Sequence, residues 1–257
     1  MKHYFNVSRH TALLIRWIKE WFDKNGKDCN AIIGLSGGKD STIIAKLLCE
    51  AIGKDRVIGV GMPDAGQGLN EADKIAEWLG IKFLVADISK SVEAIKNTLD
   101  AEWSENTVQN IPPRVRMSVL FAISQTYNGR VVNTCNLSED YIGYATLFGD
   151  AAGVFAPFAK LTVSEIYQIG DHIGIPHQWC HKIPDDGLPH SKPDEEKFGF
   201  SYAELDAFIR EGHIVSKEKY EKIRKMHNSN LFKIRLLNIP AFEPDITTAN
   251  ELDVKLN

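Results

Sequence analysis

Six consecutive residues early in the chain, Ser36-Gly37-Gly38-Lys39-Asp40-Ser41, combine the side-chain types that bind a phosphate chain. Glycines let backbone N–H groups approach an anion closely, and the serine hydroxyls add further donors. Asp40 would repel a polyphosphate unless a bound Mg²⁺ lay between them, because carboxylate and phosphate oxygens are the ligands that this ion prefers. The hexapeptide therefore predicts a nucleotide-phosphate site with a divalent cation.

The residues on either side of the hexapeptide predict the elements that position it. Residues 31–35 form a short apolar run typical of a buried parallel strand, and residues 42–52 have the apolar content of a packed helix. A helix that begins here adds unpaired N–H groups and the positive end of its dipole. A plain strand-to-helix turn, in which Asp40 only caps the helix, is the alternative.

Hydrophobic patterning extends this alternation along the chain. The predicted strands are 31–35, 57–62, 83–87 and 130–135, and the predicted helices of the first half are 8–22, 42–52, 69–79 and 88–103. This pattern predicts an α/β fold with a doubly wound, mainly parallel sheet and helices on both faces. Ligands of such sheets lie beyond the carboxyl ends of the strands, which places Met62, Asp64, Gln67 and Asp87 near the hexapeptide.

Arginines and prolines lie close together in the middle of the chain. We expect a helix to begin at Asn110, with Pro112 and Pro113 in its first turn. Arg114 and Arg116 then lie near a helix start, where the dipole favours acidic side chains, so an anionic ligand would explain them. Solvated or salt-bridged arginines are the alternative.

The fourth predicted strand is followed by polar residues that suit the same site. Thr134 lies at the strand end, and Glu139 lies in the loop 136–140 that leaves it. A hydroxyl and a second Mg²⁺ ligand are useful at this position. The alternative is that residues 138–140 cap and charge the next helix.

Composition is that of an ordinary soluble globular protein. The chain has 257 residues, 44% hydrophobic and 25% charged, with a net charge of −4, which gives no general attraction to nucleic acid or to an anionic membrane. We expect one domain over residues 1–257, with 201–257 as a helical extension, and a cytoplasmic location because neither a signal peptide nor a long apolar span is evident. Four scattered cysteines, Cys29, Cys49, Cys135 and Cys180, lack CxxC spacing, so buried thiols are expected rather than a zinc site or disulfides.

The hexapeptide resembles the SGGxDS pyrophosphate loop of the ATP pyrophosphatases. It departs from the Walker A loop because Gly38-Lys39 is followed by Asp40 and not by a hydroxyl residue. The rest of the chain is similar to the NAD synthetase family, whose motifs follow in the same order. The matching segments are Asn110 to Met117, Asn133 to Asp140, Gly143 to Thr146 with Gly149-Asp150, Pro157 with Leu161-Thr162, Ile173 to Pro176, Asp194-Glu195, and Gly199 to Tyr202 with Leu205-Asp206.

This resemblance implies an adenine nucleotide alpha hydrolase-like fold and a reaction in two steps. The carboxylate of deamido-NAD attacks the α-phosphate of ATP, and ammonia then displaces AMP to give NAD. Family members use Mg²⁺ and form homodimers with the dinucleotide at the subunit interface. Ammonia is the expected nitrogen donor because the chain has no room for a glutamine-hydrolysing domain. Two alternatives stay open: another adenylating amide ligase of the superfamily with a different carboxylate, and a non-catalytic nucleotide-binding paralog.

The resemblance also implies roles for individual residues. The implied ATP contacts are Gly34, Ser36, Gly37, Gly38, Lys39, Asp40, Ser41, Met62, Gln67 and Thr134. The implied contacts to deamido-NAD are Asn110, Arg114, Asp150 and Asp185. Asp40 and Glu139 would hold the metal, and Asp40, Ser41 and Asp150 would serve catalysis. Because ammonia must be deprotonated to attack, we also expect a carboxylate, Asp150, Asp185 or Asp186, to accept a proton or bind ammonium. The apolar faces 13–22 and 115–123 are interface candidates, with intrachain core as the alternative.

Several positions depart from the family pattern. They are Gly61, Leu147, Val154, Val163, Asp185 and Leu231-Phe232, most of which replace a basic, acidic or hydroxyl residue. Several of these positions would contact phosphate or the dinucleotide, and each lost charge-assisted bond would cost about 1.5 to 3 kcal/mol. The sequence therefore supports the ATP half of the site better than the deamido-NAD half. The lysines that could compensate are Lys39, Lys160, Lys182, Lys192 and Lys233.

Overall fold

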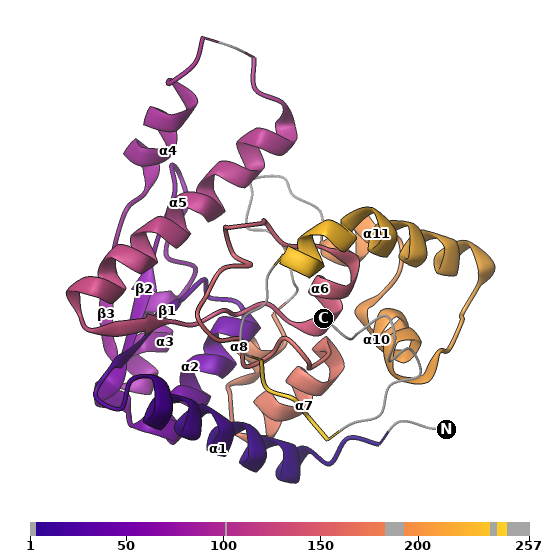
Figure 1. Ribbon diagram of the computed structural model, residues 1–257, viewed down its shortest axis with the longest axis horizontal. Coiled ribbons are helices and arrows are strands. Elements are labelled where there is room, and N and C mark those ends of the chain that lie inside the picture. The colour runs from indigo at the N-terminus through magenta and orange to yellow at the C-terminus, as the bar shows by residue number, and fades with distance from the viewer. Residues whose placement is uncertain (1–3, 101, 183–192, 237–240, 246–257) are drawn as a thin grey trace.

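The computed structural model describes residues 4–100, 102–182, 193–236 and 241–245, and Figure 1 shows its helices and strands. In chain order they are α1 Val7–Asn25, β1 Asn30–Gly34, α2 Lys39–Ile52, the 3₁₀ helix η1 Lys54–Arg56, β2 Val57–Gly61, α3 Ala72–Leu79, β3 Lys82–Val85, α4 Ser89–Lys96, α5 Glu105–Thr126, β4 Gly129–Val131, α6 Leu137–Ile142, α7 Val163–His172, α8 His177–Cys180, α9 Asp194–Phe198, α10 Tyr202–Glu211 and α11 Lys217–Leu236. Within these residues, no helix has the length and apolar character needed to cross a membrane.

The strands form one parallel sheet in the order β3-β2-β1-β4. Ile32 in β1 is paired with Ile58 of β2 on one side and with Val131 of β4 on the other. The chain leaves β1 toward β2 and β3, and later returns to add β4 on the opposite side. The carboxyl end of β1 is therefore the switch point at which sheets of this kind bind ligands.

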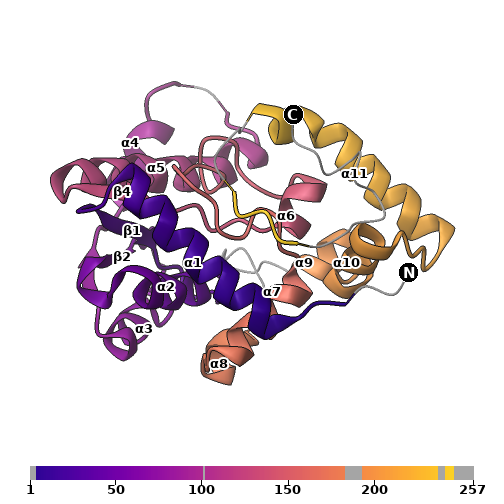
Figure 2. The ribbon, with the colours of Figure 1, turned by 60° about the horizontal axis from the view of Figure 1, so that its bottom comes forward.

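Helices cover both faces of the sheet, which confirms the predicted doubly wound α/β fold. Figure 2 shows α5 on one side of the strands and α2 with α3 on the other. Ile32, Ile58 and Val60 point toward Leu120 and Ile123 of α5. The opposite face belongs to the main hydrophobic core that α1 and α2 complete. Alternation of side chains along each strand explains why neighbouring residues enter different cores.

The two apolar helix faces that were interface candidates pack within the chain. Leu14, Ile18 and Phe22, spaced by four residues along α1, are fully buried in the main core. Val115 of α5 packs with Ile88 and with Val92 of α4. Packing within the chain therefore accounts for the buried residues of both faces, while Leu120 and Ile123 of the second face are only partly buried.

A second group of helices packs beside the sheet layer. Side chains of α6, α7, α10 and α11 share a separate hydrophobic cluster, and Figure 1 shows α10 and α11 away from the strands. A buried ion pair joins α10 to α7, because Arg210 donates from Nε and Nη2 to the two carboxylate oxygens of Glu165 at 2.7 and 2.6 Å. Helices α10 and α11 lie within the helical extension predicted to begin at residue 201.

The helix with two prolines begins earlier than predicted. Ser104 caps α5 by accepting the backbone N–H of Thr107 at 3.2 Å, so Pro112 and Pro113 lie inside the helix instead of in its first turn. The arginines after them are consequently far from the helix start, and the argument from the helix dipole was wrong. The preceding helix, predicted to reach residue 103, ends at Lys96, whose carbonyl accepts the indole N–H of Trp103 at 2.9 Å.

The fourth strand ends at Val131, earlier than predicted, although Val132 still donates its N–H to the carbonyl of Ile32 at 3.0 Å. Beyond Val131, Asn133 accepts the N–H of Cys135 through Oδ1 at 3.0 Å. Asn136 then caps α6 by accepting the N–H of Glu139 at 3.0 Å. Glu139 thus lies in the first turn of a helix, not in a loop as the strand-end prediction had it.

Candidate active site

A cavity of about 580 Å³ opens at the carboxyl ends of β1, β2 and β4. This size is typical of a site for a small-molecule ligand. Its wall contains most of the residues that the sequence predicted for the site, namely Gly34, Ser36, Gly38, Lys39, Asp40, Ser41, Met62, Gln67, Asn110, Thr134, Glu139 and Asp150. Residues that are up to 116 positions apart in the sequence (34 to 150) therefore meet at one edge of the sheet. Asp64 and Asp87 are not in this wall.

The hexapeptide forms the turn between β1 and α2. Ser36 accepts the N–H of Gly38 through Oγ at 3.2 Å, and Ser41 donates its hydroxyl to the carbonyl of Gly38 at 3.2 Å. Gly38 caps the first turn of α2, which directs the unpaired amides of the helix start toward the cavity. The turn is thus built as the predicted anion site requires.

Gly37 shapes this turn without lining the cavity. Its φ of +78° is a left-handed conformation, and a Cβ atom there would lie 1.8 Å from the carbonyl oxygen of Asn70. Asn70 and Glu71 are themselves left-handed, with φ of 48° and 71°, so α3 begins three residues later than the predicted helix. Trp179 of α8 donates its indole N–H to Glu71 at 3.0 Å and thereby supports the loop that crosses the hexapeptide.

A lysine and two carboxylates meet below the turn. Lys39 is 4% exposed, and its Nζ lies 2.7 Å from Oδ2 of Asp40. The same Nζ lies 5.7 Å from the centroid of the Tyr167 ring and 5.8 Å from that of Tyr202. Burial and then the charge of Asp40 hold the pKa of Glu139 well above its usual range. Because a divalent cation between Asp40 and Glu139 would favour the ionised form of both, these oxygen donors suit Mg²⁺.

Of the two arginines of α5, the structure places Arg116 in the wall and Arg114 outside it. Arg116 donates to the carbonyl of Met62 at 3.0 Å and to Oε1 of Gln67 at 2.9 Å. Burial lowers the pKa of this guanidinium, while the negative charges of Asp64 and Asp150 act in the opposite direction and raise it. Arg114 is exposed and donates to the carbonyl of Leu147 at 3.2 Å. Sequence spacing pointed to both arginines but gave no signal that separates them, because the start of the helix sets which face each occupies.

The opposite wall joins α5, the loop 143–150 and α11. Thr146 donates its hydroxyl to Asn110 at 2.6 Å, and its N–H donates to Oδ1 of Asp150 at 2.8 Å. Lys233 donates to the carbonyls of Gly143 and Ala145 at 3.0 and 3.2 Å. Burial raises the pKa of Asp150, and the charge of Lys233 opposes this shift. The backbone N–H of Thr146 and the charge of Lys233 therefore both act on the carboxylate of Asp150.

The departures from the family pattern fall mostly outside the wall. Gly61 lines the cavity, whereas Leu147, Val154, Val163, Leu231 and Phe232 do not. Val163 is 1% exposed and belongs to the helical core, so its replacement of a charged residue removes nothing from this wall. Lys182 and Lys233, two of the lysines expected to compensate, do line the cavity. Asp185, Asp186 and Lys192 lie outside the described residues.

A family model described as NAD synthase matches residues 11–237 of this chain. The chain belongs to the NAD synthase family. The match includes the hexapeptide, Arg116, Glu139 and Lys233, so both walls of the cavity lie within the NAD synthase region.

Individual relatives agree with this assignment. The chain is 34% identical to the NH(3)-dependent NAD(+) synthetase of Pyrococcus furiosus over 79% of this chain and 78% of that protein. It is also 34% identical to the enzyme of the same name from Methanosarcina acetivorans, over 82% and 84% of the two chains. Among solved structures, an NMN synthetase from Francisella tularensis superposes with a TM-score of 0.84 and 28% identity, covering 95% of this chain and 100% of that one. The NAD synthase fold therefore extends over nearly the whole chain.

Proposed function

We propose that this chain catalyses the ATP-dependent amidation of deamido-NAD to NAD, with ammonia as the nitrogen donor and AMP and pyrophosphate as the other products. The observation that carries the proposal is that one cavity contains both the phosphate turn and the wall of Asn110, Thr146 and Asp150. Relatives named as NH(3)-dependent NAD(+) synthetases support the choice of substrate and nitrogen donor. Amide formation of this kind needs ATP and a carboxylate in one enclosure, which the cavity provides.

In the first step, a carboxylate oxygen of deamido-NAD attacks the α-phosphorus of ATP, and the bond to pyrophosphate breaks. The amides at the start of α2 and the hydroxyls of Ser36 and Ser41 hold the departing pyrophosphate. Arg116 and Gln67, already hydrogen-bonded to each other, orient ATP. Mg²⁺ held by Asp40 and Glu139 would supply charge neutralisation at the phosphoryl oxygens.

In the second step, the nitrogen of ammonia attacks the acyl carbon and the carbon–oxygen bond to AMP breaks. The new nitrogen must lose a proton, and we assign its acceptance to Asp150. Desolvation by the surrounding wall raises the pKa of this carboxyl group above the ordinary aspartate value, although part of the residue is exposed, and a raised pKa makes the carboxylate a stronger base. The N–H of Thr146 donates to Oδ1 of this carboxylate and holds its orientation.

The direct test measures AMP and NAD formed from ATP and Mg²⁺, with deamido-NAD and ammonium each added or omitted. Equal amounts of AMP and NAD that require both additions support the proposal. Asp40→Ala should abolish AMP formation through loss of a metal ligand. Wild-type turnover by the Asp40 variant would contradict the metal role of Asp40. AMP release that does not depend on deamido-NAD would contradict the proposed reaction.

A second candidate substrate is the acid precursor of NMN, a mononucleotide. The specific observation is the similarity to the NMN synthetase structure, which covers 95% of this chain and 100% of that one. Parallel assays with nicotinic acid mononucleotide and deamido-NAD decide between the two through the ratio of kcat/KM. A ratio above about ten in favour of either acid assigns that substrate, since this corresponds to about 1.4 kcal/mol in the transition state.

The proposal also includes a homodimer in the cytoplasm. Cys29, Cys135 and Cys180 are buried free thiols, which agrees with a reducing compartment. Light scattering on the purified chain tests the pairing, and a monomer at micromolar concentration would contradict it.

A further inference from the structure

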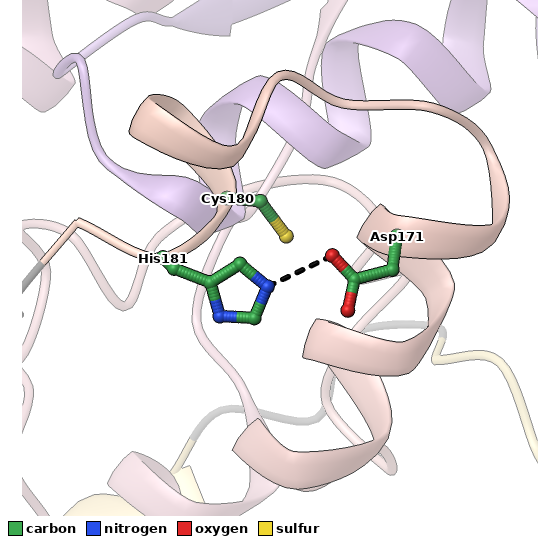
Figure 3. A group of neighbouring side chains, drawn as sticks. All are labelled: Asp171, Cys180 and His181. Atoms are coloured by element: carbon green, nitrogen blue, oxygen red, sulfur yellow. Dashed lines mark hydrogen bonds and ion pairs between the residues drawn. The ribbon is translucent and has the colours of Figure 1, made fainter.

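Three side chains of different chemistry meet at the end of α7, outside the nucleotide cavity. Asp171 lies in the last turn of α7, and Cys180 and His181 lie at the end of α8 (Figure 3). One ligand atom from each, a carboxylate oxygen, Sγ and an imidazole nitrogen, all lie within 4.8 Å of one another. The Nε2 of His181 is already 2.8 Å from Oδ1 of Asp171. None of the three lines the cavity of the proposed reaction.

Nucleophilic chemistry does not explain this cluster. Burial raises the pKa of the Cys180 thiol to about 12, so the reactive thiolate is scarce near neutral pH. The thiol is directed to the carbonyl of Tyr167 at 3.8 Å, and His181 is engaged by Asp171. A cysteine nucleophile requires the opposite arrangement, with an imidazole that withdraws the thiol proton.

The donor set matches a borderline-soft metal ion. Thiolate, imidazole and carboxylate are all ligands of Zn²⁺, whereas Mg²⁺ prefers oxygen alone. Around a tetrahedral zinc with bonds of about 2.0 to 2.3 Å, ligand atoms lie about 3.3 to 3.7 Å from one another. The three ligand atoms already lie within 4.8 Å of one another, so shifts of about 1 Å separate them from such spacing. His177, whose ring stacks on that of His181 at 4.6 Å, offers a further imidazole beside the cluster.

The surroundings favour one orientation of the imidazole. The ring of His181 stacks on Tyr167 with centroids 5.0 Å apart and an interplanar angle of 6°. Cys180 is fully buried, so its sulfur is fixed on the inner side of the cluster, while Asp171 and His181 are accessible to an incoming ion. An ion can therefore enter the cluster from the solvent side, where Asp171 and His181 lie, and meet the sulfur of Cys180 on the buried side.

We propose that Asp171, Cys180 and His181 form a binding site for one Zn²⁺ that fastens the end of α7 to α8. On binding, the S–H bond of Cys180 breaks, a sulfur–zinc bond forms and the proton passes to solvent. Water or His177 completes the coordination. Because Lys182 follows His181 directly and lines the nucleotide cavity, the bound ion also fixes the backbone that enters the wall there.

The test uses the full chain after removal of metals by a chelator, and adds Co²⁺ as a spectroscopic stand-in for Zn²⁺. We expect about one equivalent of Co²⁺ to give the ultraviolet charge-transfer band of a cobalt–thiolate bond, and Zn²⁺ to displace it. Cobalt at Asp40 and Glu139 produces no such band, because that site contains only oxygen donors. The readout is thus independent of NAD synthesis.

Matched variants locate the signal. Cys180→Ser and His181→Gln should each remove the band, while Cys49→Ser and His172→Gln, which change a half-buried thiol on α2 and an exposed histidine beside Asp171, should keep it. Circular dichroism of the metal-free variants checks the fold, and the exposed His181 variant decides if the buried Cys180 variant does not fold. Absence of the band in the wild-type chain, or its persistence in either site variant, would overturn the proposal.

Discussion

Lys39 places its ammonium 2.7 Å from the carboxylate of Asp40, its neighbour in the phosphate turn. The pair lies in the cavity wall, where Glu139 adds a second, half-buried carboxylate. Lys39 therefore supplies the positive charge that keeps these acids together before any divalent cation binds. Its raised pKa, which results from the charges of Asp40 and Glu139 outweighing burial, keeps it protonated at neutral pH.

The first prediction concerns this internal counter-ion. Lys39→Met should lower the free energy of unfolding of the metal-free chain by about 3 kcal/mol, because it leaves a buried carboxylate without a partner. Lys46→Met on the same helix removes an accessible pair with Glu50 and should cost under about 1 kcal/mol. Urea unfolding measures both values.

Added Mg²⁺ provides the second arm of this test. A divalent cation replaces the missing positive charge, so it should restore part of the stability of the Lys39 variant and stabilise the Lys46 variant less. Equal losses in the two variants, with no difference in the response to Mg²⁺, would show that Lys39 is not the counter-ion of the carboxylates.

The second prediction concerns the close approach of two loops. Gly37→Ala places a methyl group on the carbonyl of Asn70 and should reduce ATP binding strongly as well as stability. Gly174→Ala is the matched control, because its φ of +75° is similar but no atom lies within 4 Å of the added Cβ. The control should lose only the conformational cost of about 1 kcal/mol. Calorimetry measures the affinity of both variants for ATP and so separates the collision with the Asn70 carbonyl from backbone strain. Equal affinities of the two variants would exclude an effect of that collision.

The sequence predicted those parts of the site that depend on local patterns. The glycine turn, the buried strands and the helix after them follow from residue type and period alone, so Asp40 and Ser41 were placed correctly in the wall. Thr134 and Glu139 followed because parallel strands end at the same edge. Their exact secondary structure did not follow, since Asn133 and Asn136 replace backbone partners with side-chain hydrogen bonds.

Other features depend on tertiary packing and had no local signal. The cap at Ser104 shifts α5, and only that shift decides that Arg116 and not Arg114 enters the cavity. Lys233 reaches the loop 143–150 from a helix almost ninety residues later, through carbonyl contacts at Gly143 and Ala145. Cys180 was expected to be only a buried thiol, because neither Asp171 nor His181 stands at a recognised ligand spacing from it.

The third prediction compares the two arginines of α5. Arg116→Met removes the donor that holds Gln67 and the Met62 carbonyl, and should raise the KM for ATP about tenfold or more. Arg114→Met removes an exposed side chain outside the cavity and should change the KM for ATP by less than about threefold. Steady-state kinetics with saturating second substrate measures both. A larger rise in the KM for ATP in the Arg114 variant than in the Arg116 variant would show that Arg114, and not Arg116, contacts ATP.

The last prediction is a dependence of stability on pH that originates at Asp140. Burial raises the pKa of this carboxyl group from 3.8 to about 7, with a further contribution from Asp150 and an opposing one from Lys160. The folded chain holds the proton more tightly than the unfolded chain. The stabilising contribution is therefore complete below pH 3.8 and is lost as the pH rises through about 7.

Asp140→Asn removes this titration and should raise the free energy of unfolding by about 2 kcal/mol at pH 8, with little change near pH 4. Solvent screening of the partly exposed Asp140 keeps the effect below what the full difference in pKa would give. Asp55→Asn, at an exposed position in η1, is the control and should change stability by less than about 0.5 kcal/mol at either pH. Urea titrations of the three proteins at both pH values measure the effect. A gain that is the same at pH 4 and pH 8 would assign the stabilisation to packing and not to the charge of Asp140.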